Sequence, residues 1–446
     1  MNRLSFVVLS AGLSLAGSAQ TYTISTIAGT GTPGTSGDGG SALSAGLLYP
    51  QGLALTSDGQ LYFAQGNDHV VRMVDIPSGT IAHVAGIGVL GYGGNGGPAV
   101  DAGLAAPYDV ALDANGDLFI SESDAYRIRR IDRVTGIIET FAGTTSPGNN
   151  VEVPALQAQL NGPRGITFNT AGELFIGLVG NECVRYIDAD SSYLHAYVGT
   201  GANGSTGFSG DGGPALEAQL YAPYGVHVAP NGNLYIADLN NRRIRMVDVN
   251  TGIITTVAGN GQIAFDGDDV QATEAAIGRP RFVAVDAENN IYFTNEEQYR
   301  IRKVDGATGR ITTIAGTGVA GYSGDGGAAT AAAINAAFGI VVDGEGRVYF
   351  ADTYNHRIRV LTPVDDTGVA EATGQEPLFA FPSPALDLLQ VRSAARGVVE
   401  LVDAQGRQVL TGDMRTGQTT LNVCGLSAGL YTVRMVGALP TRVMVH

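Results

Sequence analysis

The chain repeats one structural unit six times. A short apolar segment that ends in Ala-Gly or Val-Gly recurs along it, and the glycines that close this segment are Gly29, Gly86, Gly143, Gly199, Gly259 and Gly316. Successive glycines are separated by 57, 57, 56, 60 and 57 residues. A period of this length indicates a supersecondary unit that needs its neighbours to bury its faces.

Each unit contains four short apolar segments with tight turns between them. In the fourth copy, the strands are predicted at 225–228, 234–238, 243–248 and 253–258, with Asn231-Gly232 and Thr251-Gly252 as turns. A proline precedes the first strand in five copies, and Ala337 replaces it in the sixth; the prolines are Pro50, Pro107, Pro163, Pro223 and Pro280. Four antiparallel strands per repeat predict a blade of a β-propeller.

The two ends of the repeat region predict how the ring closes. The unit that begins at Ala337 has three strands, and the segment 22–28 matches the missing fourth strand. Pairing the two would remove two open sheet edges, whereas an open solenoid would leave 22–28 unpaired. The 64 glycines and the 44% of hydrophobic residues are typical of an all-β chain with many tight turns. We therefore expect a six-bladed propeller over residues 20–362, followed by a small β-sandwich.

Two stretches of this repeat resemble the NHL-repeat family. They are Asp238-Leu-Asn-Asn-Arg-Arg-Ile-Arg-Met-Val-Asp248 and Asp352-Thr-Tyr-Asn-His-Arg-Ile-Arg359, and the similarity extends over residues 22 to 362. The chain is similar to the variant with a Ser-Gly-Asp-Gly-Gly insert, which occurs at 209–213 and 323–327. The resemblance implies a propeller that serves as a binding platform, a sensor domain or, less often, an enzyme.

The N-terminal residues indicate export. Arg3 precedes an apolar run over 4–15, and Gly17-Ser18-Ala19 offers small residues for cleavage before Gln20. This pattern predicts a signal peptide at 1–19. A transmembrane anchor is the alternative, but the run falls short of the about 20 residues that cross a bilayer. Cys183 and Cys424 fall in different predicted domains, so we expect no structural disulfide.

The repeat stops after residue 362, and a different domain follows. Residues 363–376 predict an acidic linker, and the alternating segments of 377–446 predict a small β-sandwich. Pro382-Ser-Pro384, Asp403-Ala-Gln-Gly406 and the stretches 425–431 and 442–445 resemble the C-terminal sorting domain of the type IX secretion system, although His446 stands where a basic Lys or Arg is usual. This resemblance implies a protein exported through the periplasm, secreted or held at the outer surface, with the type IX machinery as a partner. A carbohydrate-binding or immunoglobulin-like module is the alternative.

The charge balance narrows the class of ligand. The chain has 42 acidic and 26 basic residues, a formal charge of −16. Nucleic acids and anionic membranes require a basic surface, so we expect neither as a partner, and no membrane span. The expected ligand is an extracellular glycan, peptide or protein, bound by a monomer.

Long connections gather on one face of the predicted propeller, where we expect function. Six loops of 20 to 24 residues lead into the first strands, and each contains an Ala/Ala/Leu or Ala/Ala/Ile pattern that predicts a helical turn packed on the blade. The Ser-Gly-Asp-Gly-Gly insert is predicted as a turn rather than an ion site, because it offers one carboxylate. Asp266-Gly-Asp-Asp269 is denser in acid and is the one candidate for calcium, and no other cofactor is expected.

Two sets of repeated positions are candidates for binding. One arginine recurs in every unit and is interpreted as a bond between the second and third strands rather than as a ligand ring; the set is Arg72, Arg129, Arg185, Arg245, Arg302 and Arg359. The residue at the channel end of each first strand instead differs between copies. Five of these six residues are aromatic or basic and are predicted to bind a sugar or a carboxylate, or merely to plug the channel: Tyr108, Arg164, Tyr224, Arg281 and Phe338.

The alternative function is a secreted hydrolase or lyase, lactonase-like, with a divalent metal in the central channel. Such an enzyme needs several His, Glu, Asp or Asn ligands that converge on the channel. The six histidines are scattered over loops, strands and the chain end, and no nucleophile motif has partners. We therefore expect a binding module, and no catalytic residue is assigned.

Overall fold

The computed structural model describes residues 20–201, 206–364 and most of the strands between 376 and 445. The chain divides into two compact units, Met1–Asp365 and Asp366–His446. The predicted signal peptide and most of the predicted acidic linker lie outside the described residues. No helix among the described residues is long and apolar enough to cross a membrane.

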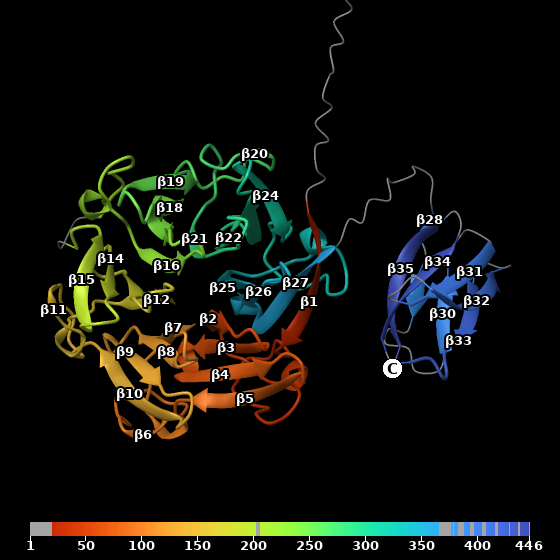
Figure 1. The fold of residues 1–446 in the computed structure, drawn as a ribbon, viewed down its shortest axis with the longest axis horizontal. Helices are drawn as coiled ribbons and strands as arrows, with labels where there is room; N and C mark the ends of the chain where they lie inside the picture. Colours follow the sequence, from red (N-terminus) through yellow and green to blue (C-terminus); the bar gives the residue numbers. More distant parts are fainter. Residues whose placement is uncertain are drawn as a thin grey trace, which may run out of the picture. The chain divides into compact units, whose positions relative to one another are not determined.

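Six sheets form a closed ring in the first unit (Figure 1). The first strands of the blades line the centre and contact one another in order around it; they are β2 (Pro50–Leu55), β7 (Pro107–Leu112), β12 (Pro163–Phe168), β16 (Pro223–Val228), β21 (Pro280–Val285) and β25 (Ala337–Val342). Proline fits the first position of a strand because its missing N–H removes no ladder bond there. The predicted propeller fold is confirmed.

Outward from the centre, each blade adds three antiparallel strands. The second strands are β3 (Gln60–Gln65), β8 (Leu118–Glu122), β13 (Leu174–Leu178), β17 (Leu234–Asp238), β22 (Ile291–Asn295) and β26 (Val348–Asp352). The third strands are β4 (Val70–Asp75), β9 (Arg127–Ile131), β14 (Cys183–Ile187), β18 (Arg243–Val247), β23 (Arg300–Val304) and β27 (Arg357–Val364). The outermost strands are β5 (Thr80–Ala85), β10 (Ile137–Ala142), β15 (Tyr193–Val198), β19 (Ile254–Ala258), β24 (Arg310–Ala315) and β1 (Thr21–Ala28).

The last blade is completed by the first strand of the chain. β1 pairs antiparallel with β27, from Thr21 opposite Val364 to Ala28 opposite Ile358. Tyr22 and Ile24 of β1 are buried in the core of this blade. The predicted closure between the two ends of the repeat is therefore confirmed.

The inserts of the long loops cover the outer edges of the sheets. Short strands pair with the outermost strands β10, β15 and β24 in three blades; they are β6 (Gly97–Pro98), β11 (Val153–Pro154) and β20 (Val270–Gln271). In the other three blades an isolated bridge does the same, as between Ser41 and Thr80. Part of each outer edge is thus paired with the loop that leads into the same blade, which protects against edge-to-edge association.

The predicted helical turns are present and buried. A 3-10 turn begins at the first alanine of the pattern in five copies: 42–44, 99–101, 155–157, 215–217 and 329–331. In the remaining copy, the fifth along the chain, a hydrogen bond from Ala275 N to Ala272 O makes a comparable turn. Ala42, Ala45 and Leu47 are fully buried in a core cluster that joins two neighbouring blades. Three further 3-10 turns, 66–68, 239–241 and 353–355, connect second and third strands.

The repeated glycine after each outermost strand has a backbone conformation and a close backbone neighbour that a side chain would not allow. Gly86 has a φ of +97°, and a Cβ there would lie 2.1 Å from the carbonyl oxygen of His69. Only glycine combines this left-handed conformation with so close a backbone approach. The glycine period therefore marks the point at which each outermost strand turns into its long loop.

The second unit contains two small sheets. One has the strand order β28 (Glu376–Pro377), β35 (Ala438–Val445), β34 (Gly429–Met435), β31 (Gly397–Val402) and β32 (Gln408–Met414). The other has β29 (Phe379–Phe381), β30 (Leu388–Arg392) and β33 (Gln418–Asn422). Apolar side chains of both sheets share one core, including Leu389, Val399 and Val433, which agrees with the predicted β-sandwich.

Candidate functional site

The five predicted binding residues come together where the first strands begin. Each is the second residue of its strand, just after a long loop, so all lie at the same end of the central channel, here called the channel mouth. The guanidinium carbon of Arg164 lies 4.0 Å from the centre of the Tyr108 ring and 5.5 Å from that of Tyr224. The guanidinium carbon of Arg281 lies 4.6 Å from the centre of the Tyr224 ring and 3.9 Å from that of Phe338. The cluster alternates cations with aromatic rings.

Burial divides this cluster into a floor and a rim. Tyr108 and Phe338 are only 4% and 6% exposed, so they fill the channel as a plug would. Arg164, Tyr224 and Arg281 are half-buried and keep part of their surface accessible. Tyr108 and Phe338 therefore fill this end of the channel, while Arg164, Tyr224 and Arg281 remain partly accessible.

Arg281 is neutralised inside the protein. Its Nη2 and Nε donate to Glu296 Oε2 at 2.7 and 3.0 Å, and its Nη1 donates to the Tyr108 hydroxyl at 2.7 Å. Burial alone would lower the pKa of Arg281, but Tyr108, Glu296 and Tyr224 outweigh it and raise the pKa. Glu296, which directly follows β22, was not among the predicted site residues, because nothing in the repeat pattern links it to the channel mouth.

Arg164 has no such partner. Among residues 20–201 and 206–364, no carboxylate lies within ion-pair distance of Arg164, and its side chain makes no hydrogen bond. Its Nε is buried without an acceptor, and Oε1 of Gln51, at the same position in the first blade, is buried without a donor. Arg164 is thus the arginine of the mouth whose charge has no protein partner within the described residues.

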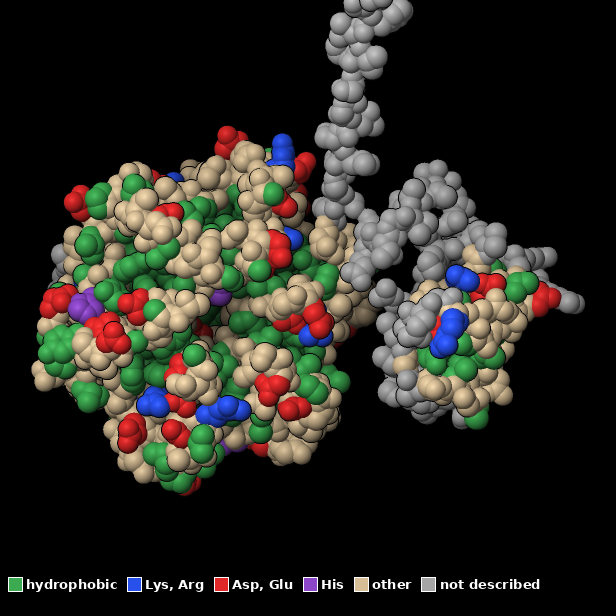
Figure 2. Space-filling view, viewed as in Figure 1, with side chains coloured by type: hydrophobic (Ala, Val, Ile, Leu, Met, Phe, Trp, Pro, Cys, Tyr) green, Lys and Arg blue, Asp and Glu red, His purple; other side chains and the backbone are tan. Residues whose placement is uncertain are grey.

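Farther along the channel, the first strands line a cavity of about 230 Å³ that includes none of the five mouth residues. Figure 2 shows the space-filled ring, with a hollow at its centre and acidic side chains scattered over the surrounding blades. Asp109 and His227 are the titratable residues in the lining of this cavity. Burial raises the pKa of Asp109 to about 8 and lowers that of His227 to about 4.

These two side chains do not make the ligand set that a channel metal requires. Asp109 Oδ2 accepts a hydrogen bond from the backbone N–H of Ile166 at 2.9 Å. Nowhere in the described part of the chain do three or more His, Cys, Asp or Glu side chains group as metal ligands. The residues present do not fit the divalent metal of the lactonase-like alternative, and we derive no step through such a metal.

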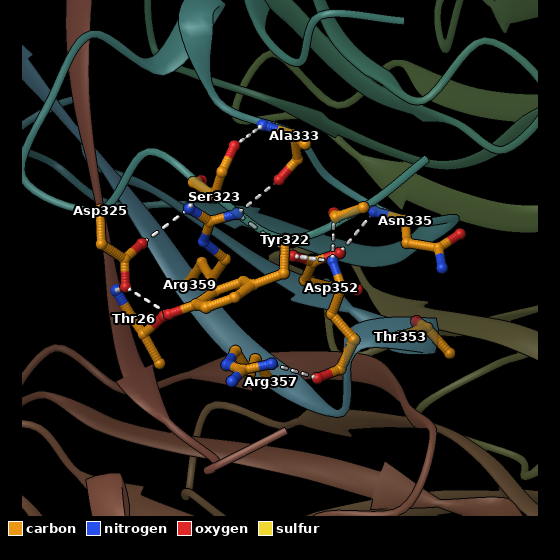
Figure 3. Close-up of polar contacts among 12 residues, drawn as sticks. Thr26, Tyr322, Ser323, Asp325, Ala333, Asn335, Asp352, Thr353, Arg357 and Arg359 are labelled. Atoms are coloured by element: carbon orange, nitrogen blue, oxygen red, sulfur yellow. Dashed lines mark hydrogen bonds and ion pairs between the residues drawn. The ribbon is translucent and has the colours of Figure 1, made fainter. Parts of the chain in front are cut away.

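The repeated arginines anchor the long loops. Figure 3 shows this arrangement at Arg359, whose Nη1 donates to Ala333 O at 3.0 Å and whose Nη2 donates to Ser323 O at 2.8 Å and to Asp325 Oδ1 at 2.7 Å. Arg72 and Arg245 make the same three bonds at the same sequence offsets. All six arginines are at most 2% exposed, so they are architectural and present no ligand ring.

Some of these arginines have a second carboxylate partner besides the acid that the sequence predicted. The expected bond to the acid at the end of the second strand is present between Arg359 and Asp352 at 3.3 Å, but Asp238 lies 3.9 Å from Arg245. The shorter contact is made by the aspartate of the Ser-Gly-Asp-Gly-Gly insert, 34 residues before the arginine. That constant offset was visible in the sequence and could have revealed the pair.

The insert also binds β1, the strand that closes the ring. Asp325 Oδ2 accepts hydrogen bonds from Thr26 N of β1 at 3.2 Å and from the Tyr322 hydroxyl at 2.8 Å (Figure 3). The insert is thus a turn, and its carboxylate is used within the protein.

The calcium candidate has protein partners at each carboxylate. Asp268 Oδ1 accepts from Arg302 at 3.0 Å and from Thr313 at 2.9 Å, and Asp266 Oδ2 accepts from Ala276 N at 2.8 Å. Asp269 pairs with Arg310 at 3.2 Å. The stretch therefore plays the same anchoring role as the inserts of other blades.

Two family models match separate parts of the chain. The teneurin NHL domain matches residues 194–266, and the secretion system C-terminal sorting domain matches residues 380–440. The first match falls within the ring and the second within the β-sandwich. The second places the chain among proteins that are secreted or delivered to the outer surface, and it implies contact with the secretion machinery.

Curated relatives match mainly the propeller. The chain is 25% identical over 389 residues to Protein SUPPRESSOR OF QUENCHING 1, chloroplastic, of Arabidopsis thaliana, covering 82% of this chain and 35% of that protein. It is 25% identical over 339 residues to NHL repeat-containing protein 2 of Gallus gallus, covering 74% and 41%, and 30% identical over 235 residues to human teneurin-1, covering 48% and 8%. The chain thus spans well under half of these relatives.

Solved structures share the fold. A protein of unknown function from Bacteroides thetaiotaomicron superimposes with a TM-score of 0.58 at 18% identity, covering 78% of this chain and 77% of that one. A protein described as an auxiliary nutrient binding protein from the same organism has a TM-score of 0.55 at 18% identity, covering 77% of each chain.

Proposed function

Because the chain is an NHL-type β-propeller followed by a secretion-system sorting domain, we propose that it is an exported binding module. The propeller recognises an extracellular ligand through its long-loop face, and the recognition site is the channel mouth. Its residues are those predicted from the sequence: Tyr108, Arg164, Tyr224, Arg281 and Phe338. The ligand is a glycan, a peptide or a protein segment small enough to reach this mouth.

One observation carries the proposal. The blades repeat their arginine anchors, buried alanines and glycine turns, yet the residue at the channel mouth differs from blade to blade. A ring of identical blades offers no asymmetric site, whereas this mouth combines a half-exposed tyrosine with two guanidinium groups. Planar rings and arginine forks are the groups that dominate recognition surfaces in proteins.

The position also suits a binding role. Side chains at the mouth are held by the starts of six strands, so they are carried on rigid elements instead of on mobile loop tips. One structurally similar protein carries a description as a nutrient binding protein. The proposal gives this propeller a role of the same general kind, with the ligand argued from its own side chains.

The test is an array of glycans and peptides probed with the exported chain, followed by titration of the best binder. The double variant Tyr224→Ala and Arg281→Ala removes an aromatic face and a guanidinium that lie against each other. We expect binding to weaken at least about tenfold, about 1.4 kcal/mol, since each group contributes contact area or hydrogen bonds.

A matched control lies on the opposite face. Arg133→Ala removes an exposed arginine from the turn between β9 and β10, far along the blade from the mouth. This variant should bind like the parent. Because Arg281 also bonds to Tyr108 and Glu296, a melting curve must show that the double variant is folded. Binding by a folded double variant equal to that of the parent would place recognition elsewhere, on the outer parts of the long loops.

A further inference from the structure

The two arginines of the channel mouth occupy equivalent positions but differ in their ion pairing. Arg164 is the second residue of β12 and Arg281 the second residue of β21, and their guanidinium groups both lie close to the Tyr224 ring. Arg281 has the carboxylate of Glu296, which follows directly after β22. At the corresponding position after β13, the chain has Val179. The blade of Arg164 therefore lacks the acid that neutralises its counterpart.

The environment of Arg164 strengthens this contrast. Stacking on Tyr108 at 4.0 Å occupies a face of the guanidinium and leaves its edge donors for a partner in the same plane. Only Nε of Arg164 is both buried and unbonded, so its terminal nitrogens reach the surface without a protein partner among the described residues. The mouth thus presents one uncompensated positive charge with an open pair of donors.

We infer that the carboxylate missing beside Arg164 is supplied by the ligand, and that the ligand is a glycan carrying a uronic acid. This inference rests on the proposed function and names the ligand class of the same site. A carboxylate fits the planar donor pair of a guanidinium bidentately. The half-exposed ring of Tyr224 next to it offers a flat apolar surface for the C–H face of a sugar ring.

An extended aromatic surface favours a sugar over a peptide. Tyr354 is 48% exposed and packs edge-on against Phe338 of the mouth, with ring centres 6.0 Å apart, and Tyr49 packs against Tyr354 at 5.5 Å. Aromatic side chains therefore extend from the mouth along the blade of Phe338 to the loop that enters the next blade, as an oligosaccharide with several rings requires.

The overall charge limits how acidic the glycan is. A net charge of −16 repels polyanions, while a single cation at the mouth matches a single carboxylate. The fitting ligand is a largely neutral oligosaccharide with one uronic acid, and a long polyuronate is disfavoured.

The experiment compares two probes that differ in one residue. A xylo-oligosaccharide bearing a single glucuronic acid branch and the same oligosaccharide without the branch are titrated calorimetrically against the full chain. We expect the acidic probe to bind at least about tenfold more tightly, which corresponds to about 1.4 kcal/mol. Arg164→Ala should abolish this difference and leave the weaker binding of the neutral probe.

A second variant tests the same point by adding a carboxylate in the blade of Arg164. Val179→Glu supplies blade three with the acid that Glu296 supplies to Arg281, and Val179 is half-buried at a loop, so the larger side chain has room. This variant should lose the preference for the acidic probe without losing any group of the site. Arg242→Ala is the matched control: Arg242 lies in the loop before β18 on the same face, has no ion pair among the described residues, and should leave the preference intact.

The outcomes distinguish a failure of the uronic acid assignment from a failure of the proposed function. Equal binding of both probes, with binding lost in the double variant Tyr224→Ala and Arg281→Ala, would overturn the uronic acid and keep the mouth as the site. Binding of acidic peptides but of neither oligosaccharide would overturn the glycan. An equal loss of preference in Arg164→Ala and Arg242→Ala would show a diffuse charge effect and overturn the role of Arg164. Binding unaffected by every mouth variant would overturn the proposed function itself.

Discussion

One buried arginine in each blade holds a long loop of this propeller in place. Each repeated arginine lies inside a blade. Five of them donate to a carbonyl group of the long loop that precedes the blade, whereas Arg185 donates to Gly199 O and Thr200 O in the loop that follows it. In four blades the insert carboxylate completes the arrangement, with Asp38, Asp211, Asp268 and Asp325 as the partners. Burying a guanidinium is unfavourable unless its donors are satisfied, so the loop is held where it can satisfy them.

Asp109 is a buried acid in the channel that has no counterpart in the other blades. It stands in the channel where four other blades have glycine: Gly52, Gly165, Gly225 and Gly339. Its pKa of about 8 exceeds the usual value of 3.8 because burial disfavours the carboxylate. The folded state therefore holds a proton that the unfolded chain has lost between these pH values, and this group's contribution to stability falls as pH rises from about 4 to about 8.

Asp109→Asn should remove that pH dependence. Asparagine keeps an oxygen acceptor for the Ile166 N–H and stays neutral at every pH. We expect the melting temperature of the variant to exceed that of the parent by more at pH 9 than at pH 5, since one pKa unit corresponds to about 1.4 kcal/mol. Differential scanning fluorimetry across this range measures the gap. A constant gap would show that Asp109 is ionised in the folded protein over the whole range.

Each long loop has two structural roles, one in its first part and another in its second part. The first part of each loop wraps around the outer edge of the next blade and pairs with its outermost strand, as Gly39 N does with Ile81 O at 2.8 Å. The second part makes the buried 3-10 turn and leads to the channel. Most of each loop is thus structural, and the proposed recognition residues lie just after the loops, at the starts of the first strands.

Removal of β1 tests the closure of the ring. Deleting residues 20–29 exposes the edge of β27 and takes Ile24, 1% exposed, out of the core. It also removes Thr26 from the insert aspartate Asp325. We expect a large loss of stability, of several kcal/mol, because burial of one large side chain alone contributes about 2–5 kcal/mol. Chemical denaturation of both proteins gives the difference, and equal midpoints would mean that β1 does not close the ring.

On the scale of the whole molecule, the propeller and the sorting domain have separate cores. The β-sandwich core is formed by residues of the second unit alone, and the propeller clusters by residues of the first. Export and the proposed ligand binding can therefore be tested separately. Stability of the propeller should not depend on residues beyond its last strand.

A chain that ends at Asp366 tests this division. The end is chosen beyond Val364, because β27 pairs with β1 up to that residue. We expect the shortened protein to melt like the propeller of the parent and to stay in the periplasm of a host with type IX secretion, as fractionation and immunoblotting would show. Surface delivery of the shortened chain would contradict the sorting role of the second unit.

The sequence alone determined the fold of this protein, because a repeated pattern of strands, turns and glycines admits few arrangements. The six copies, the unpaired strand at 22–28 and the change of pattern after residue 362 led to a closed propeller followed by a sandwich. The repeated alanines, such as Ala42 and Ala45, showed where the loops pack. These are local or periodic signals, which a single chain displays directly.

Tertiary structure alone decided how the channel mouth is paired. Tyr108 and Arg281 are 173 residues apart and meet because the ring closes, and Glu296 neutralises Arg281 while Val179 leaves Arg164 without an acid. The insert aspartates differ, because their constant offset of 34 residues from the arginines is visible in the sequence. The pairings at the mouth depend on distances across the channel, which no periodicity along the chain encodes.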